Sequence, residues 1–147
     1  MVRRLSLALP LMLMVAACGG SPSAPPQADQ QAKLFEPPQP SRGALYVYRS
    51  GLMGAMRPVD VSLAGGASAQ LGYHTFIRVE GPPGPIDLAC KVGDNTTNSQ
   101  IQIQDGQIRF VEVSMRAGLW TPSCDVAEVP PDQGQAAVRS YRRVEPL

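Results

Sequence analysis

The sequence has few of the residues from which catalytic and metal sites are built. Its 147 residues include one histidine, His74, and three cysteines. Zinc needs three or four nitrogen, sulfur or oxygen ligands at short range, and one histidine without a Cys-x-x-Cys spacing does not supply them. No Gly-x-Ser-x-Gly sequence surrounds any serine, so a hydrolytic triad has to run through His74 alone. The composition therefore predicts no metal, no cofactor and no enzymatic activity.

Two further absences concern charge and hydrophobic length. The chain carries 13 basic and 12 acidic side chains, which leaves no strongly basic face for nucleic acid. Its N-terminal apolar run covers residues 5–17, whereas a membrane-spanning helix needs about 20 apolar residues. Pro10 further disturbs a helix in this run. We therefore expect neither a nucleic-acid partner nor a stable transmembrane helix.

The N-terminus has the layout of a secretory signal. A cationic start is followed by the apolar run, and the small residues Ala16 and Ala17 stand directly before Cys18. This pattern resembles the bacterial lipobox, which implies a diacylglyceryl group on Cys18, cleavage before it and acylation of the new amino terminus. Two or more acyl chains hold a protein stably on a membrane. The alternative is an ordinary secreted protein in which Cys18 is incidental.

The same resemblance implies a location and a size for the mature chain. Gly19 is non-acidic, which is similar to the outer-membrane retention pattern of lipoproteins. Cleavage after residue 17 leaves 130 residues, enough for one domain but not for two. It removes Arg3 and Arg4, so 11 basic side chains face 12 acidic ones and the net charge is about −1. We expect a protein on the periplasmic face of the outer membrane, with the membrane and an envelope protein as candidate partners.

The two remaining cysteines form an even pair in an oxidising compartment. Cys90 shares the apolar face of its predicted strand with Leu88 and Val92, and Cys124 is in phase with Val126. A metal site or a redox thiol lacks further ligands or a Cys-x-x-Cys spacing. The sequence therefore predicts a Cys90–Cys124 disulfide.

The chain divides into three parts. Residues 1–17 are the expected signal peptide, residues 18–42 the lipidated cysteine and a proline-rich tether, and residues 43–147 a β-sandwich domain. The tether is rich in Pro, Ser, Gln and Ala and cannot bury enough apolar surface to order itself. As an extended chain it reaches on the order of 70 Å from the membrane. Leu34 and Phe35 are its one apolar interruption and offer a docking point.

Short segments of alternating polarity predict an all-β fold, an antiparallel β-sandwich of about 7–8 strands with a short C-terminal helix over residues 132–141. The expected strands are 44–49, 57–63, 68–71, 73–80, 86–92, 99–104, 107–115 and 123–129. Apolar residues on both phases indicate that segment 44–49 is covered on both faces. Asp105 and Gly106 predict a type I′ hairpin turn, and residues 93–98 are expected to form a loop. The phase change within 107–115 indicates a bulge or burial on both faces.

Several of these segments resemble a bacterial lipoprotein family known only as a domain of unknown function. The motifs that carry the resemblance are Ala44-Leu45-Tyr46-Val47-Tyr48-Arg49, Val59-x-Val61-x-Leu63-x-Gly65, Gly72-Tyr73-x-Thr75-Phe76-x-x-Val79, Pro83-Gly84 and Gly106-x-x-x-Phe110-Val111-x-Val113. The resemblance covers residues 44–129 and implies a small sandwich of immunoglobulin- or transthyretin-like type. It implies no catalytic residues. Segment 132–147 departs from the family, which commonly has a longer acidic or lysine-rich helix there.

The candidate partner-binding residues are Leu52, Met53, Met56 and Trp120, because exposed methionine and tryptophan suit contacts with a partner. The alternative is that they cap the ends of the sandwich as part of its core. A ligand- or glycan-binding protein predicts instead a concave aromatic pocket around Trp120 and Tyr73, and a hydrolase predicts His74 beside a serine or aspartate. The sequence favours a lipid-anchored binding or structural module of the cell envelope.

Overall fold

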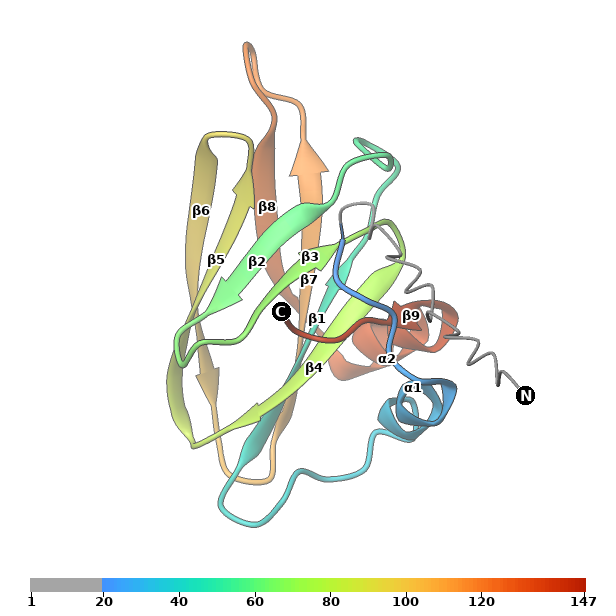
Figure 1. Ribbon diagram of the computed structural model, residues 1–147. Coiled ribbons are helices and arrows are strands. Elements are labelled where there is room, and N and C mark those ends of the chain that lie inside the picture. Colours follow the sequence, from blue (N-terminus) through green and yellow to red (C-terminus); the bar gives the residue numbers. More distant parts are fainter. Residues whose placement is uncertain (1–19) are drawn as a thin grey trace, which may run out of the picture.

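The computed structural model describes residues 20–147, which form two β-sheets and two helices (Figure 1). In chain order the elements are α1 (Pro26–Ala32), β1 (Gly43–Arg49), β2 (Val59–Leu63), β3 (Ser68–Leu71), β4 (Thr75–Gly81), β5 (Gly84–Val92), β6 (Asn95–Ile103), β7 (Ile108–Arg116), β8 (Ser123–Val129), α2 (Pro131–Ser140) and β9 (Arg142–Arg143). The expected signal peptide and Cys18 lie outside the described residues. No helix within residues 20–147 is long and apolar enough to cross a membrane.

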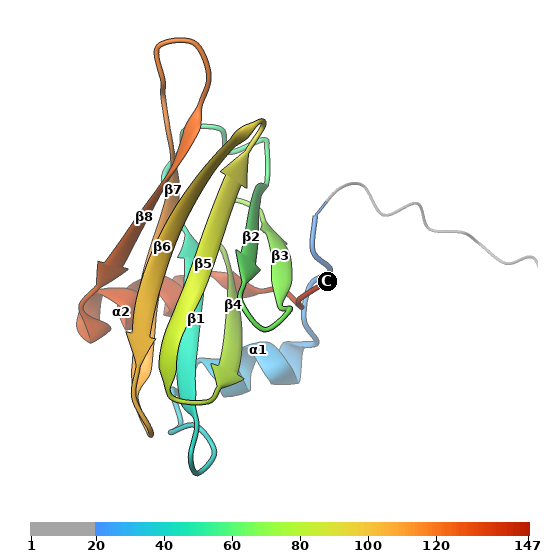
Figure 2. The ribbon, with the colours of Figure 1, turned by 90° about the vertical axis from the view of Figure 1, so that its left-hand side faces the viewer.

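The two sheets face each other in a sandwich-like arrangement. One has five strands in the order β8-β7-β1-β4-β9, and the other has four in the order β3-β2-β5-β6. Figure 2 looks onto the four-stranded sheet, with the other sheet and the helices behind it. Alternation along β2 shows how the sequence directs this packing, because Val59, Val61 and Leu63 are buried while Asp60 and Ser62 are exposed. The main apolar core lies between the two sheets.

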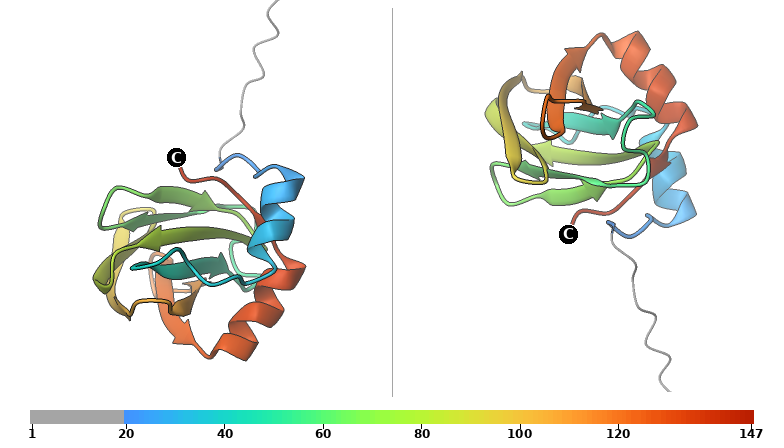
Figure 3. Two further views of the ribbon diagram at one scale, coloured as in Figure 1. Left: turned by 90° about the horizontal axis from the view of Figure 1, so that it is seen from below. Right: turned by 90° about the horizontal axis from the view of Figure 1, so that it is seen from above.

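Strand β1 is buried on both faces, as its sequence predicted. Leu45 and Val47 belong to the core between the sheets. Tyr46 and Tyr48 belong to a second cluster beneath the helices, which cover the outer face of the five-stranded sheet (Figure 3). The C-terminal helix α2 is also confirmed. It lies so close to β7 that a Cβ atom at Gly134 would overlap the ring of Phe110.

The predicted all-β class is confirmed, but the expected antiparallel pairing and the count of about 7–8 strands are not. Nine strands form within the described range, and β1 pairs with β7, and β4 with β9, in parallel. Asp105 and Gly106 do turn the chain, but they lead from β6 in one sheet to β7 in the other rather than into a hairpin. A turn sequence specifies the local backbone and not which strand the following segment will pair with. Strand β1 offers a free edge to β7, so the chain changes sheets there.

The hairpin lies one connection earlier. Val92 pairs with Asn95, so Gly93 and Asp94 form a two-residue turn between β5 and β6. The predicted loop at 93–98 is therefore wrong. The segment is polar because β6 alternates intermediate and exposed positions until Ile101, and a strand at a sheet edge needs no apolar residues on its solvent face.

Residues 20–42 are not an extended tether. Pro26–Ala32 forms α1, with Pro26 at its first position, and Ala24 and Ala32 are buried against the domain. The Tyr46 hydroxyl donates a 2.7 Å hydrogen bond to the Ala32 carbonyl. Phe35 packs onto the aromatic cluster of β1 and β7, so the docking point expected there is present. Small apolar side chains suffice here because the sheet already presents an aromatic surface to cover.

Candidate functional site

Parallel pairing of β1 and β7 brings two loops to one end of the molecule. Loop 50–58 follows β1 and loop 117–122 follows β7, and parallel neighbours end at the same edge of a sheet. The Ser50 amide donates a 3.0 Å hydrogen bond to the Val113 carbonyl, and Gly54 abuts Met115. Both loops are seen together at the top of Figure 1.

We call the exposed apolar side chains of these loops the end-loop surface. Its members, with their exposed fractions, are Leu52 (77%), Met53 (50%), Met56 (97%), Leu119 (90%) and Trp120 (90%). All four candidate partner-binding residues are therefore at one end and in contact with solvent. The alternative that they cap the core is wrong, because the core under loop 50–58 is closed by Met115 and the buried Arg49.

Arg49 holds loop 50–58 from below. Its side chain is fully buried at the end of β1, and its guanidinium donates to backbone carbonyls of Met53 (3.4 Å), Gly54 (2.6 Å), Leu71 (3.2 Å) and Arg57. Burial lowers the pKa of Arg49, because desolvation disfavours the charged form. Three of its acceptors are carbonyls of loop 50–58. The guanidinium therefore satisfies backbone carbonyls that have no partner strand or helix to bond.

The second loop is anchored at its base. The Asn95 side chain donates 2.8 Å hydrogen bonds to the Thr121 hydroxyl and the Pro122 carbonyl. At Gly118 a Cβ atom would collide with the Thr121 carbonyl, so the tight return requires glycine. Arg116 and Asp125 form an ion pair across the hairpin neck. Trp120 therefore projects from a loop whose ends are fixed.

Sequence reasoning did not identify Arg49 or Asn95 as anchors of these loops. For Arg49 a signal was present in the sequence. Residues 45, 47 and 49 lie on one face of the strand, and a charged residue on a face that carries Leu45 and Val47 is exceptional. No comparable signal marks Asn95, because its partners lie on a loop 26 and 27 residues away.

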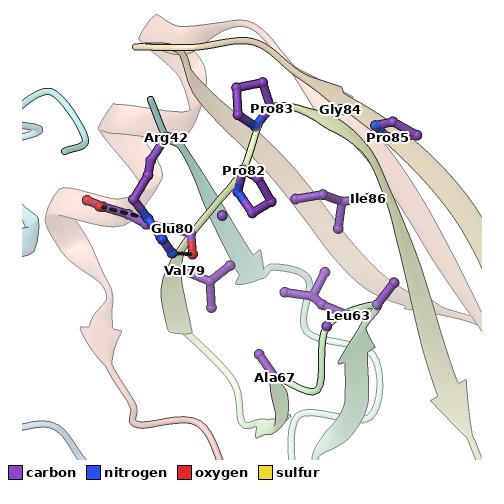
Figure 4. Close-up of a pocket in the computed structure, with 13 residues that line it drawn as sticks. Arg42, Leu63, Ala67, Val79, Glu80, Pro82, Pro83, Gly84, Pro85 and Ile86 are labelled. Carbon is purple, nitrogen blue, oxygen red and sulfur yellow. Dashed lines mark hydrogen bonds and ion pairs between the residues drawn. The ribbon is translucent and has the colours of Figure 1, made fainter. Parts of the chain in front are cut away.

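A pocket of about 380 Å³ lies between the turn that connects β4 to β5 and the turn that connects β2 to β3 (Figure 4). We call it the proline-turn pocket. Leu63, Val79 and Ile86 point into it, and Pro82 and Pro83 form part of its rim. Its lining is aliphatic.

Arg42 and Glu80 stand at the polar edge of the proline-turn pocket. Arg42 donates a 2.6 Å hydrogen bond to the Glu80 carbonyl, and Arg78 forms a 2.5 Å ion pair with the Glu80 carboxylate. Burial by itself raises the pKa of Glu80, but hydrogen bonds from Arg78 and the Gln39 amide, with the charges of Arg78 and Arg42, outweigh it and lower the pKa.

The residues proposed for ligand or catalytic chemistry lie elsewhere. His74 is exposed and stacks between Tyr73 and Tyr141, with ring centroids at 3.7 and 4.3 Å. Tyr73 and Trp120 are on different loops, and neither lines the proline-turn pocket. In the part of the chain that the structure covers, no group of three or more His, Cys, Asp or Glu side chains is arranged to hold a metal ion.

The disulfide prediction is confirmed. Cys90 on β5 is bonded to Cys124 on β8, with a Cα–Cα distance of 5.9 Å, so the bond joins the two sheets. A hydrogen bond of 2.9 Å from the Thr97 hydroxyl to the Cys124 carbonyl reinforces the same junction. Cys18 lies outside the described residues.

Comparison with known proteins assigns no family. No family model matches the sequence, and no solved structure matches it. An uncharacterized protein of Haemophilus influenzae (strain ATCC 51907 / DSM 11121 / KW20 / Rd) is 20% identical over 130 residues, which cover 86% of this chain and 75% of that protein.

Proposed function

We propose that this chain is a lipid-anchored lipoprotein of the cell envelope whose β-sandwich acts as a binding or structural module without catalytic activity. The observation that carries the proposal is the Cys90–Cys124 disulfide. Structural disulfides persist in oxidising compartments such as the bacterial periplasm and are rare in the cytosol. With this pair oxidised, Cys18 is the cysteine left for lipid, and it stands directly after a signal-like segment.

The fold supports the finer part of the proposal. Two facing sheets with a shared apolar core favour a sandwich of immunoglobulin- or transthyretin-like type, and the strand motifs favour the lipoprotein family of unknown function that they resemble. Gly19 favours the outer membrane, facing the periplasm. Because residues 20–42 are folded onto the domain, the lipid would hold the sandwich close to its leaflet rather than at the end of a long tether.

The test is acylation and fractionation of the wild type and two variants. Cells grown with an alkyne-tagged fatty acid are expected to label the wild-type protein and a Ser23→Ala control, and both proteins are expected in the membrane fraction. Cys18→Ser is expected to lose the label and to leave the membrane. Equal labelling of all three proteins, or of none, contradicts the proposal. Crosslinking of the labelled forms in intact cells then identifies an envelope partner.

The proline-turn pocket favours a second candidate function, binding of a small ligand. Its volume is in the range of small-molecule sites, and its aliphatic lining with Arg42 at the edge fits an apolar ligand better than a glycan, which usually stacks on aromatic rings. Native mass spectrometry of the purified protein is expected to detect such a ligand in the wild type and not in Ile86→Trp, which fills the pocket. Identical spectra without added mass exclude this candidate.

A further inference from the structure

The end-loop surface is unusual because it is both apolar and held in place. Five large hydrophobic side chains point into solvent from two loops, and exposed clusters of this kind mark interaction sites. Arg49 fixes one loop through backbone carbonyls and Asn95 fixes the other at its base. Their exposure is therefore a property of the folded state.

The path of the chain indicates what covers this surface. Gly20 and Met56 line one shallow groove, so the N-terminal segment enters the domain beside loop 50–58. Ser21 fixes this entry, since its amide donates to the Gln70 carbonyl (3.3 Å) and its hydroxyl accepts from the Gln70 amide (2.9 Å). Two peptide units separate Cys18 from Gly20, so their Cα atoms are at most about 7 Å apart.

An anchor at Cys18 then places the membrane. If the acyl chains of Cys18 are embedded in a leaflet, Gly20 lies near the membrane surface, and Met56 across the same groove lies near it too. Met56 is the most exposed of the five side chains. Tryptophan prefers the interface between headgroups and acyl chains, where its ring is buried and its N–H stays hydrated.

We propose that the end-loop surface docks onto the leaflet that carries the Cys18 lipid, with Met56 and Trp120 in the headgroup region. The inference rests on the proposed lipoprotein function and adds an orientation to it. The docked surface is a bilayer of phospholipid, and the opposite end of the sandwich, with the proline-turn pocket, faces the periplasm.

The charged side chains at this end indicate whether docking is electrostatic or hydrophobic. Arg57 and Arg116 are exposed there, but Asp94 in the β5–β6 turn and Asp125 on β8 stand beside them, and Arg116 is paired with Asp125. Arg142 also lines the groove at Gly20, and the exposed Asp60 and Lys91 are cross-strand neighbours next to the β5–β6 turn. These four basic and three acidic side chains leave an excess of one positive charge, so attraction to anionic lipid is weak. Docking is hydrophobic and is expected to change little with salt, unlike contacts between exposed charges.

Trp120 is the single tryptophan of the chain, so its fluorescence reports this contact directly. The full mature protein, purified from membranes, is reconstituted into vesicles of phosphatidylethanolamine and phosphatidylglycerol, with and without phospholipid brominated near the headgroup. We expect blue-shifted emission, about twofold quenching by the brominated lipid and little quenching by iodide, as for an interfacial tryptophan. Flotation of the vesicles reports the anchor separately.

Variants that keep Trp120 test the shared surface. The double variant Leu52→Ser with Met56→Ser is expected to restore iodide quenching and to lose most of the quenching by bromine. Leu34→Ser is the matched control, because Leu34 is similarly exposed but belongs to the segment after α1. Circular dichroism verifies that all forms are folded.

Three outcomes overturn the inference. A protein that floats with the vesicles while Trp120 remains open to iodide has its anchor but does not dock. Blue-shifted emission that bromine does not quench indicates burial against protein, either a partner or a second copy. A protein that does not float has no anchor, and the proposed function fails together with the inference.

Discussion

Arg49 shows how one buried side chain can determine a surface. A fully buried guanidinium is costly unless its hydrogen bonds are made. Here backbone carbonyls accept from both Nη atoms of Arg49, while its buried Nε has no partner. The acceptors lie on the loop that carries Leu52, Met53 and Met56. The loop and the charge therefore stabilise each other.

Replacing Arg49 by methionine is expected to lower the free energy of unfolding by about 3 kcal/mol, because the carbonyls it satisfies lose their donor. Arg116→Met removes an arginine of an exposed ion pair and is expected to cost less than about 1 kcal/mol. Urea unfolding followed by circular dichroism measures both. Equal effects of the two substitutions would show that Arg49 does not organise the loop.

Glu80 gives the protein a stability that depends on pH. Its folded-state pKa lies below the ordinary value of 4.5, so its contribution is present above that pH and is lost as the pH falls through the folded-state pKa. Glu80→Gln is expected to be less stable than the wild type near neutral pH and equal to it in strong acid. Urea midpoints measured across this range test the sign, and a stability gap that widens on acidification contradicts the assignment.

At the scale of the elements, the sequence determined which segments are strands more than how they pair. Alternating polarity predicted β2 and β3. Apolar residues at both odd and even positions of β1 predicted that the strand is buried on both faces. Phe110 and Val111 explain the phase change in β7, since Phe110 faces the helices and Val111 faces the core between the sheets. The parallel pairing of β1 and β7 was not predictable, because no local pattern records a partner more than 60 residues away.

Helix α1 was missed because its composition is typical of disorder. Its order comes from the domain: Asp29 accepts a 2.7 Å hydrogen bond from the Arg143 amide, and the Phe35 ring lies 5.6 Å from that of Tyr46. Tertiary contacts of this kind override a weak local preference.

Truncation of Phe35 tests this docking. Phe35→Ala is expected to cost about 1 to 2 kcal/mol and to reduce hydrogen-exchange protection in α1, because the ring packs on two others. The neighbouring Leu34 is 66% exposed, and Leu34→Ala is expected to cost less than about 0.5 kcal/mol. Unchanged hydrogen exchange in Phe35→Ala would show that the Phe35 ring does not hold α1 on the domain.

The disulfide joins elements of different sheets that are 34 residues apart in sequence. Its removal by Cys90→Ala with Cys124→Ala is expected to lower stability by about 3 to 4 kcal/mol, since the unfolded chain regains the entropy of an open loop. Urea unfolding in the presence and absence of a reductant measures the effect. Reductant is expected to destabilise the wild type and to leave the double variant unchanged; a wild type insensitive to reductant contradicts this prediction.

At the scale of the whole molecule, two ends of one sandwich have different surfaces. One end carries the apolar loops and the entry of the N-terminal segment, and the other carries the aliphatic proline-turn pocket. The sequence supplied the candidate residues Leu52, Met53, Met56 and Trp120, but only the parallel strands explain why they come together. An anchored domain with this layout presents its pocket away from the lipid.

The account depends most directly on the chemistry of Cys18. Mass spectrometry of the protein extracted from membranes and digested with protease gives the composition of its N-terminal peptide. The account predicts a peptide that begins at Cys18 and carries the mass of a diacylglyceryl group and an amide-linked acyl chain. A peptide that begins at another residue, or one with an unmodified Cys18 thiol, would contradict it.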